Sequence, residues 1–386
     1  MSISEAPLKG FGEVRTGPDL WAGRMRSMGN AWDMLNRIRG DVRDNPEGQI
    51  DPTEGFAVDN GEYILSLHRA LAAGPIKPTP ATYGNNGHTV QEMPYWELGP
   101  SNPDSLKKLD IGEDRYVMYG RFADFPVGHR ALATDIAARV YTHTLLDLPQ
   151  RAAKLPPRPH NPDYAKDWLH GQRMLFMLTS MQEVRPGQFA CIAYGKSNGR
   201  EYMLGSVGGA PGIGEREVIH TVGNDGTEAK PPSSIPSNFA LRFPISPEGM
   251  VTLRGIREEQ CFEPTRLWKS PIPRSLGIET SDIAVALYST IFDAANDVGG
   301  GIFTHAIFNT KPALHEMLKK LGFKVITLAN LAKPTPGILA TVHGAYYSKF
   351  YEGEASPVVQ CLEVPSALQT GWNLQESFNN LDWLNI

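Results

Sequence analysis

Apolar residues recur at helical spacing in six segments of the chain, and each repeat predicts an amphipathic helix. The segments are residues 20–38, 63–71, 129–141, 164–178, 283–298 and 310–321. End signals support the last two helices. Ser281 or Asp282 can cap the first of these, and Gly322 follows the second where a helix end needs a positive φ.

Short apolar runs predict strands between and after these helices. FACIAYG and EYMLGSVG are separated by KSNGR, which is a hairpin turn signal. Further strands are predicted at residues 238–245, 250–256, 261–268, 299–308, 323–328, 337–347 and 356–364. The stretch 208–237 is rich in Gly, Pro and Ser and predicts a long loop.

This order of helices and strands predicts an α+β fold with a central mixed, mostly antiparallel sheet flanked by helices. Residues 1–115 are expected to form an N-terminal extension, partly helical and otherwise irregular, and residues 116–386 the main domain. The extension is expected to pack on the main domain, cover its active site or join subunits of a homodimer. A poorly ordered leader is the alternative.

Composition narrows the class of protein. Hydrophobic residues make up 41% of 386, enough for a sizeable core, and a net charge of −5 argues against a polynucleotide partner. Cys191, Cys261 and Cys361 are scattered and odd in number, which is typical of reduced thiols. No apolar run reaches the roughly 18 residues that a membrane span needs, so we expect a cytoplasmic protein.

A strand, a helix ending in Lys320-Leu321-Gly322-Phe323 and a returning strand lie near the C-terminus. This order, over about residues 116 to 365, resembles the GNAT acyltransferase superfamily, and an unrelated α+β fold is the alternative. The resemblance implies a splayed central sheet and a phosphate-binding turn that contains Arg274 and Gly277, with Asn309 in the same cofactor-binding set. Glu279 departs from the pattern because a carboxylate repels a pyrophosphate. A plain proline-flanked loop is the alternative for this turn.

Glu263-Pro264-Thr265-Arg266 resembles the Glu-x-Ser/Thr-Arg signature of one GNAT-like branch, the autoinducer synthases, which make acyl-homoserine lactones. The tyrosine that many GNAT enzymes use as a general acid is absent from residues 317–320. The resemblance implies acyl transfer from acyl-CoA or an acyl carrier protein to S-adenosylmethionine, without a metal.

The chemistry of the signature fits that reaction. An ammonium group must lose a proton before it can attack a thioester, and Glu263 is a candidate base. Thr265 should share its face of the strand, and Arg266 could bind a substrate carboxylate or orient Glu263. Pro264 cannot donate to a ladder, so it predicts a bulge. A surface ion pair between Glu263 and Arg266 is the alternative.

The rest of the synthase pattern is looser. The resemblance implies substrate-binding roles for an arginine, aromatic residues and an aspartate, which Arg139, Tyr141, Asp163 and Trp168 could fill. The arginine-containing segment of the synthases is replaced by residues 205–210. GSVGGAPGIG lacks the order of a dinucleotide-binding loop and predicts a mobile loop over the active site.

The expected function is therefore N-acyl transfer. The alternatives are a GNAT enzyme acting on another small amine and a catalytically silent scaffold that binds a metabolite. Arg254, Arg257 and Lys269 could dock an acidic carrier protein. The histidines show no metal-ligand spacing, and His305 is expected to be a hydrogen-bonded core residue rather than a catalyst.

Overall fold

The computed structural model describes residues 54–73, 82–83, 90–142, 181–212, 215, 217, 247–270, 283–310, 318, 325–330 and 358–363. The helices are α2 (Gly61–Ala72), α3 (Val127–Thr142), α6 (Pro247–Leu253) and α7 (Ile283–Gly299). The strands are β1 (Thr82–Tyr83), β2 (Val90–Gln91), β3 (Met93–Pro94), β4 (Lys107–Gly112), β5 (Arg115–Arg121), β6 (Glu183–Val184), β7 (Phe189–Ser197), β8 (Arg200–Pro211), β9 (Cys261–Lys269), β10 (His305–Thr310), β11 (Val325–Asn330) and β12 (Val358–Glu363). Short 3-10 turns include η3 (Tyr95–Glu97) and η9 (Glu258–Gln260).

Within these residues, eight strands form one mixed sheet in the order β11-β12-β10-β9-β8-β7-β5-β4. Each neighbouring pair is antiparallel except β9 and β10, which run parallel. The predicted α+β class and the mixed, mostly antiparallel sheet are therefore confirmed.

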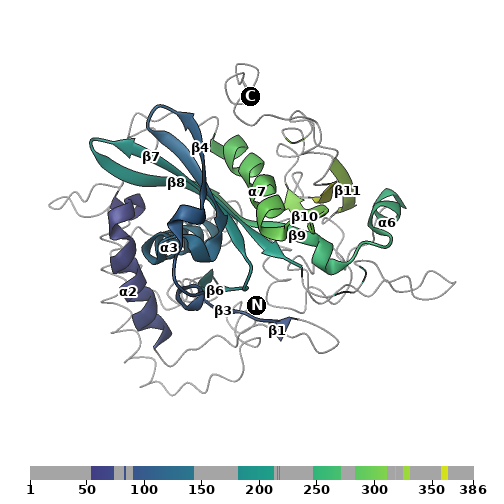
Figure 1. Ribbon diagram of the computed structural model, residues 1–386, viewed down its shortest axis with the longest axis horizontal. Helices are drawn as coiled ribbons and strands as arrows, with labels where there is room; N and C mark the ends of the chain where they lie inside the picture. Colours follow the sequence, from purple (N-terminus) through teal and green to yellow (C-terminus); the bar gives the residue numbers. More distant parts are fainter. Residues whose placement is uncertain are drawn as a thin grey trace, which may run out of the picture.

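Helices cover the two faces of the sheet (Figure 1). On one face, the Tyr119 hydroxyl of β5 donates to Asp293 of α7 at 2.6 Å. On the other face, Tyr194 of β7 and His129 of α3 are joined by a 2.9 Å hydrogen bond, and α2 packs on the outside of α3. The face under α7 holds an aromatic cluster in which Phe262 of β9 meets Phe189, Phe292 and Phe303.

Local sequence accounts for the long hairpin and for α7. Ser197 pairs with Arg200, so Asn198 and Gly199 form a two-residue loop, with φ of 52° and 75°. Asn-Gly favours this left-handed turn, which matches the twist of the flanking strands. In α7, the buried Ser289 hydroxyl donates to the carbonyl one turn earlier, so a polar group is satisfied within an apolar helix.

Two predictions of secondary structure are wrong, one at residues 250–256 and one at residues 208–211. Residues 250–256 were expected as a strand, but α6 extends to Leu253 and Gly255 follows with a φ of 75°. Pro247 in the first turn favours a helix, because its missing N–H is not needed there.

Residues 208–211 were expected in a loop over the active site but form the end of β8. The glycines of β8 allow neighbouring side chains to pack directly against the strand, and they do not form a mobile loop. A Cβ on Gly209 would lie 2.1 Å from the Phe189 ring, and one on Gly205 would lie 2.9 Å from Leu287.

The sheet begins before the expected domain boundary between residues 115 and 116. β4 ends at Gly112 and pairs along β5, which begins at Arg115, so the expected boundary falls within β5, after its first residue. None of the helices that the structure describes is long and apolar enough to cross a bilayer.

Candidate active site

The two parallel strands at the centre of the sheet separate after a short contact. β9 and β10 pair at Cys261 with His305 and at Phe262 with Ala306, and their ladder extends no further. Glu263 is therefore the first β9 residue past the point where the two strands part. The splayed sheet implied by the sequence is present at this junction.

Glu263 and Thr265 share one face of β9. The register pairs Glu263 with Ala210 and Thr265 with Gly208. Phe262 points to the α7 face, where its ring contacts Phe292, so alternation places Glu263 and Thr265 on the face that carries α3. Both side chains are half-buried. The carboxyl group expected to be the base therefore lies in a partly desolvated position beside the splay.

β9 contains the bulge that the sequence predicted, but the bulge lies beyond Pro264. Pro264 pairs in register with Gly209, whereas the ladder to β8 shifts between Thr265 and Trp268. Arg266 lies inside that shift and has a φ of 58°. The residue with left-handed backbone, and not the proline, is where β9 leaves regular geometry.

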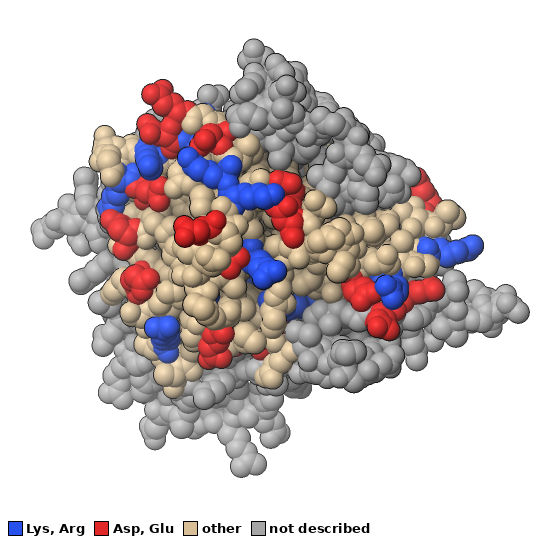
Figure 2. All heavy atoms as spheres, viewed as in Figure 1, with Lys and Arg blue, Asp and Glu red and all other residues tan. Residues whose placement is uncertain are grey.

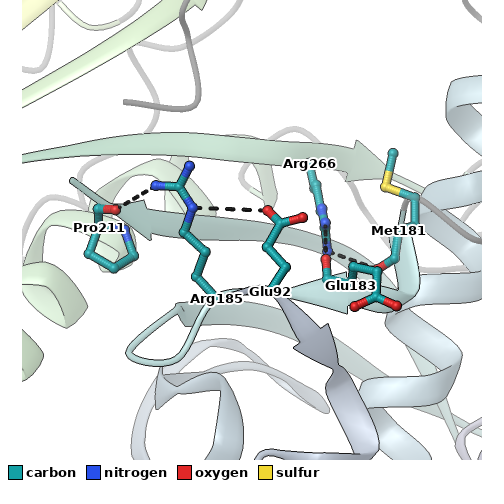
Figure 3. Close-up of polar contacts among 6 residues, drawn as sticks. All are labelled: Glu92, Met181, Glu183, Arg185, Pro211 and Arg266. Carbon is teal, nitrogen blue, oxygen red and sulfur yellow. Dashed lines mark hydrogen bonds and ion pairs between the residues drawn. The ribbon is translucent and has the colours of Figure 1, made fainter. Parts of the chain in front are cut away.

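The Arg266 side chain binds the main chain of a neighbouring segment (Figure 3). Its Nη1 donates to the carbonyl of Met181 and its Nη2 to the carbonyl of Glu183, each at 3.0 Å. Glu183 and Val184 form β6, which pairs with β3. We call β3 and β6, residues 93–94 and 183–184, the ribbon. Arg266 thus joins the ribbon to β9.

Arg185 joins the ribbon segment to β8, with the arginine on the ribbon side. This residue was not identified from the sequence. It follows the ribbon, is only 2% exposed, and donates from Nη1 to the carbonyl of Pro211 at the end of β8, at 3.0 Å. Its Nε lies 3.9 Å from a carboxylate oxygen of Glu92 (Figure 3). The signal in the sequence is an arginine next to a two-residue strand, which no periodicity rule detects.

Glu183 is a titratable group whose pKa is raised to about 7. Burial is the largest cause, and the negative charges of Glu92 and Glu97 add to it. In Figure 3 its carboxyl group points away from Arg266, while its carbonyl accepts the arginine hydrogen bond. The main chain of Glu183, rather than its carboxyl group, faces β9.

The described residues contain only part of the expected site. Arg139 and Tyr141 lie in α3 and Asn309 in β10, but the positions of their side chains are outside the description. The remaining four residues are wholly outside it: Asp163, Trp168, Arg274 and Gly277. Glu263, Thr265 and Arg266 are therefore the expected site residues whose side chains the structure describes.

His305 lies at the closed end of the splay. It is 7% exposed, and its Nδ1 lies 2.7 Å from the Thr304 hydroxyl. These features agree with the expected hydrogen-bonded core histidine. Among the described residues, no three His, Cys, Asp or Glu side chains are grouped to hold a metal ion.

Acidic and basic side chains are interspersed over the face seen in Figure 2, including the region of α6. Arg257, one of the residues considered for docking an acidic carrier, forms a 2.6 Å ion pair with Glu259. This contact balances part of the positive charge in the region, so electrostatic complementarity to an acidic carrier is weaker than the sequence indicates.

No protein-family model matches the chain, and no curated protein matches it in sequence. Among solved structures, the AHL synthase LasI matches with 12% identity, covering 66% of this chain and 91% of LasI, at a TM-score of 0.31. The CoA-dependent acyl-homoserine lactone synthase MesI matches with 13% identity, 64% and 91% coverage, and a TM-score of 0.30. FeeM, an N-acyl amino acid synthase from uncultured soil microbes, matches with 12% identity, 50% and 75% coverage, and a TM-score of 0.27.

LasI and MesI are synthases of the acyl-homoserine lactone class, whose signature residues 263–266 resemble.

Proposed function

We propose that this chain is an acyltransferase that moves an acyl group from a thioester to the amine of an amino-acid-like substrate. The preferred substrates are S-adenosylmethionine and an acyl-CoA or acyl carrier protein thioester. The observation that carries the proposal is the position of Glu263, a half-buried carboxyl group on β9 at the first residue past the separation from β10.

The reaction needs a proton acceptor and a place for an extended thioester. In the proposed step, Glu263 takes a proton from the substrate ammonium, directly or through a water molecule. The neutral amine attacks the thioester carbonyl, the C–N bond forms and the C–S bond breaks, and the second N–H proton passes to the departing thiolate, which leaves as a free thiol. With S-adenosylmethionine as the acceptor, its carboxylate then attacks the γ-carbon, so that the lactone closes as the sulfonium C–S bond breaks and 5′-methylthioadenosine leaves. Where β9 and β10 part, their facing edges no longer pair with each other, and we assign the thioester arm to this position.

Thr265 lies on the same face as Glu263 and opposite Gly208, which has no side chain of its own. Its hydroxyl can both donate and accept a hydrogen bond. We assign it to hold the substrate or the water that carries the proton. The sequence signature and this shared face support the assignment.

The purified full chain can be tested with octanoyl-CoA and S-adenosylmethionine. The expected result is release of free thiol together with 5′-methylthioadenosine, and an acyl-homoserine lactone identified by mass spectrometry. Thiol release with homoserine lactone or a polyamine, without 5′-methylthioadenosine, would favour a different amine acceptor.

Absence of thiol release above spontaneous hydrolysis would contradict acyl transfer, provided that acyl carrier protein thioesters and each amine have also been tried. Tight binding of S-adenosylmethionine by calorimetry in that case would favour the silent scaffold instead.

A further inference from the structure

Arg266 holds a backbone conformation that its side chain disfavours. Its φ of 58° lies in the left-handed region, where the Cβ of an L-residue crowds the following carbonyl oxygen. Glycine, asparagine and aspartate are the usual residues in such a bulge. Strained backbone persists where the surrounding structure holds it, and such positions cluster at functional sites.

The side chain of the same residue supplies the contact that can hold it. Its two terminal nitrogens donate to two carbonyls of the same short segment, those of Met181 and Glu183. A planar guanidinium can bridge two acceptors in this way, whereas an ammonium group acts as a single point. The hydrogen bonds of the Arg266 side chain can therefore stabilise the left-handed backbone of the same residue.

Arg185 strengthens the arrangement from the opposite direction. It donates from the segment next to the ribbon to the carbonyl of Pro211, and Pro211 pairs with Phe262 on β9. Hydrogen bonds thus join residues 181–185 to both β8 and β9. Each of these three hydrogen bonds ends on a main-chain oxygen, so the bonds themselves require the two arginines but no particular side chain on the acceptor residues.

We propose that Arg266 is a positioning residue. It fastens the ribbon to β9 and so fixes the bulge next to Thr265 and the face that carries Glu263. The proposal rests on the proposed function. Of the two roles expected of Arg266, it takes orienting Glu263 over binding a substrate carboxylate, because two of the five guanidinium N–H groups donate to main-chain carbonyls.

Arg266→Gly separates the two properties of this residue. Glycine accepts the positive φ without strain, so the bulge can remain, but the double hydrogen bond is lost. Arg266→Lys keeps a positive charge on a long side chain but loses the planar guanidinium that donates to two carbonyls at once. The matched control is Arg200→Ala, which removes an arginine whose partner is the exposed carboxylate of Asp59, 2.7 Å away.

The first measurement is hydrogen exchange by mass spectrometry on peptides that contain residues 181–185. Exchange should rise about 10-fold in Arg266→Gly, since the ribbon loses its attachment to β9, and should stay at the wild-type rate in Arg200→Ala. Unchanged exchange in Arg266→Gly would overturn the proposal, whatever the activity of the variant.

The second measurement is the rate of thiol release. In Arg266→Gly, kcat should fall about 100-fold while KM for the amine changes little, because a small misplacement of reacting groups affects the transition state most. Added methylguanidinium should restore part of kcat, and Arg266→Lys should lie in between. A large rise in KM with unchanged kcat would overturn the proposal in favour of direct binding of substrate.

These measurements separate the two claims. Faster exchange with no acyl transfer in any variant, wild type included, would support the attachment and contradict the proposed function. Wild-type exchange together with wild-type turnover in Arg266→Gly would support the function and contradict the positioning role.

Discussion

Two regions on the α3 face of the sheet contain buried polar groups, and they are built differently. Under α2 and α3, Arg130 is 1% exposed and donates to the carbonyls of Phe125, Tyr95 and Gly99, at 2.8, 2.9 and 3.3 Å. Nearby, the fully buried His68 lies 3.0 Å from the Tyr95 hydroxyl and 3.6 Å from Asp135. Arg130, His68 and Asp135 lie in the regular helices α3 and α2, Tyr95 lies in η3, and Phe125 and Gly99 lie in the connections beside these elements.

Around β9, the buried polar groups accompany departures from regular structure. The ladder with β10 is limited to two residue pairs, the ladder with β8 contains a bulge, and Arg266 has a positive φ. Arg266 and Arg185 bind carbonyls beside the bulge and the end of the β9–β10 ladder, whereas Arg130 binds carbonyls next to the packed helices α2 and α3.

The two regions therefore use arginine for different purposes. An arginine such as Arg130, which binds carbonyls beside packed helices, stabilises the fold, so its loss should lower the free energy of unfolding. A cation that holds strained backbone next to a carboxyl group contributes to geometry, and its loss should appear first in the reaction. The following substitutions test this distinction.

Glu263→Gln should have the largest effect. The amide keeps the shape of the side chain but cannot accept the ammonium proton, so turnover should fall by about 10²- to 10⁴-fold. The thermal midpoint should change little. The assay is thiol release from octanoyl-CoA with S-adenosylmethionine.

Glu201→Gln is the matched control. Glu201 is a half-buried carboxylate on β8 that accepts the Tyr116 hydroxyl at 2.5 Å, near the hairpin rather than the splay. Equal losses of turnover in the two variants would contradict the role of Glu263.

Arg130→Met should reduce the free energy of unfolding by about 3 kcal/mol, because the carbonyls of the buried Tyr95 and Phe125 lose a charged donor. Urea denaturation followed by circular dichroism measures the loss. Turnover of the protein that remains folded should be close to wild type. A folded variant with greatly reduced turnover would remove the contrast between the two regions.

Gly209→Ala should cost about 2 kcal/mol, because its Cβ would overlap the buried Phe189 ring. Gly208→Ala is the control on the next residue. Its Cβ would find its nearest neighbour, Gln188, at 3.4 Å, which is ordinary contact. Denaturation midpoints should fall for the first variant and stay within error for the second. Equal midpoints would contradict close approach as the reason for a glycine at position 209.

Glu183→Gln should give a small effect that depends on pH. The pKa of Glu183 is raised to about 7 in the folded protein, so the folded state binds the proton more tightly than the unfolded chain. Stability is therefore lost as pH rises from the ordinary carboxyl value through 7.

The variant should be more stable than wild type by about 1 kcal/mol at pH 8, after allowance for solvent screening, and equal to it at pH 4. Thermal midpoints at both pH values provide the check. A variant with the same advantage at pH 4 and pH 8 would show that the carboxyl charge is not the cause.

Elements with local signals could be predicted from the sequence alone. Helical spacing predicted α3 and α7, and Asn-Gly predicted the turn between β7 and β8. These follow from the backbone preferences of neighbouring residues and from which side chains recur on one face. The same reasoning predicted that Glu263 and Thr265 share a face and that β9 contains a bulge.

Tertiary structure decided what depends on contact between distant segments. The glycines near position 209 looked like a loop because sequence cannot show that an aromatic ring from β7 occupies the space beside them. The position of the bulge at Arg266, and the carbonyls of Met181 and Glu183 that its side chain binds, depend on a segment more than 80 residues earlier in the chain. Main-chain acceptors leave no mark in a sequence, because every residue has a carbonyl.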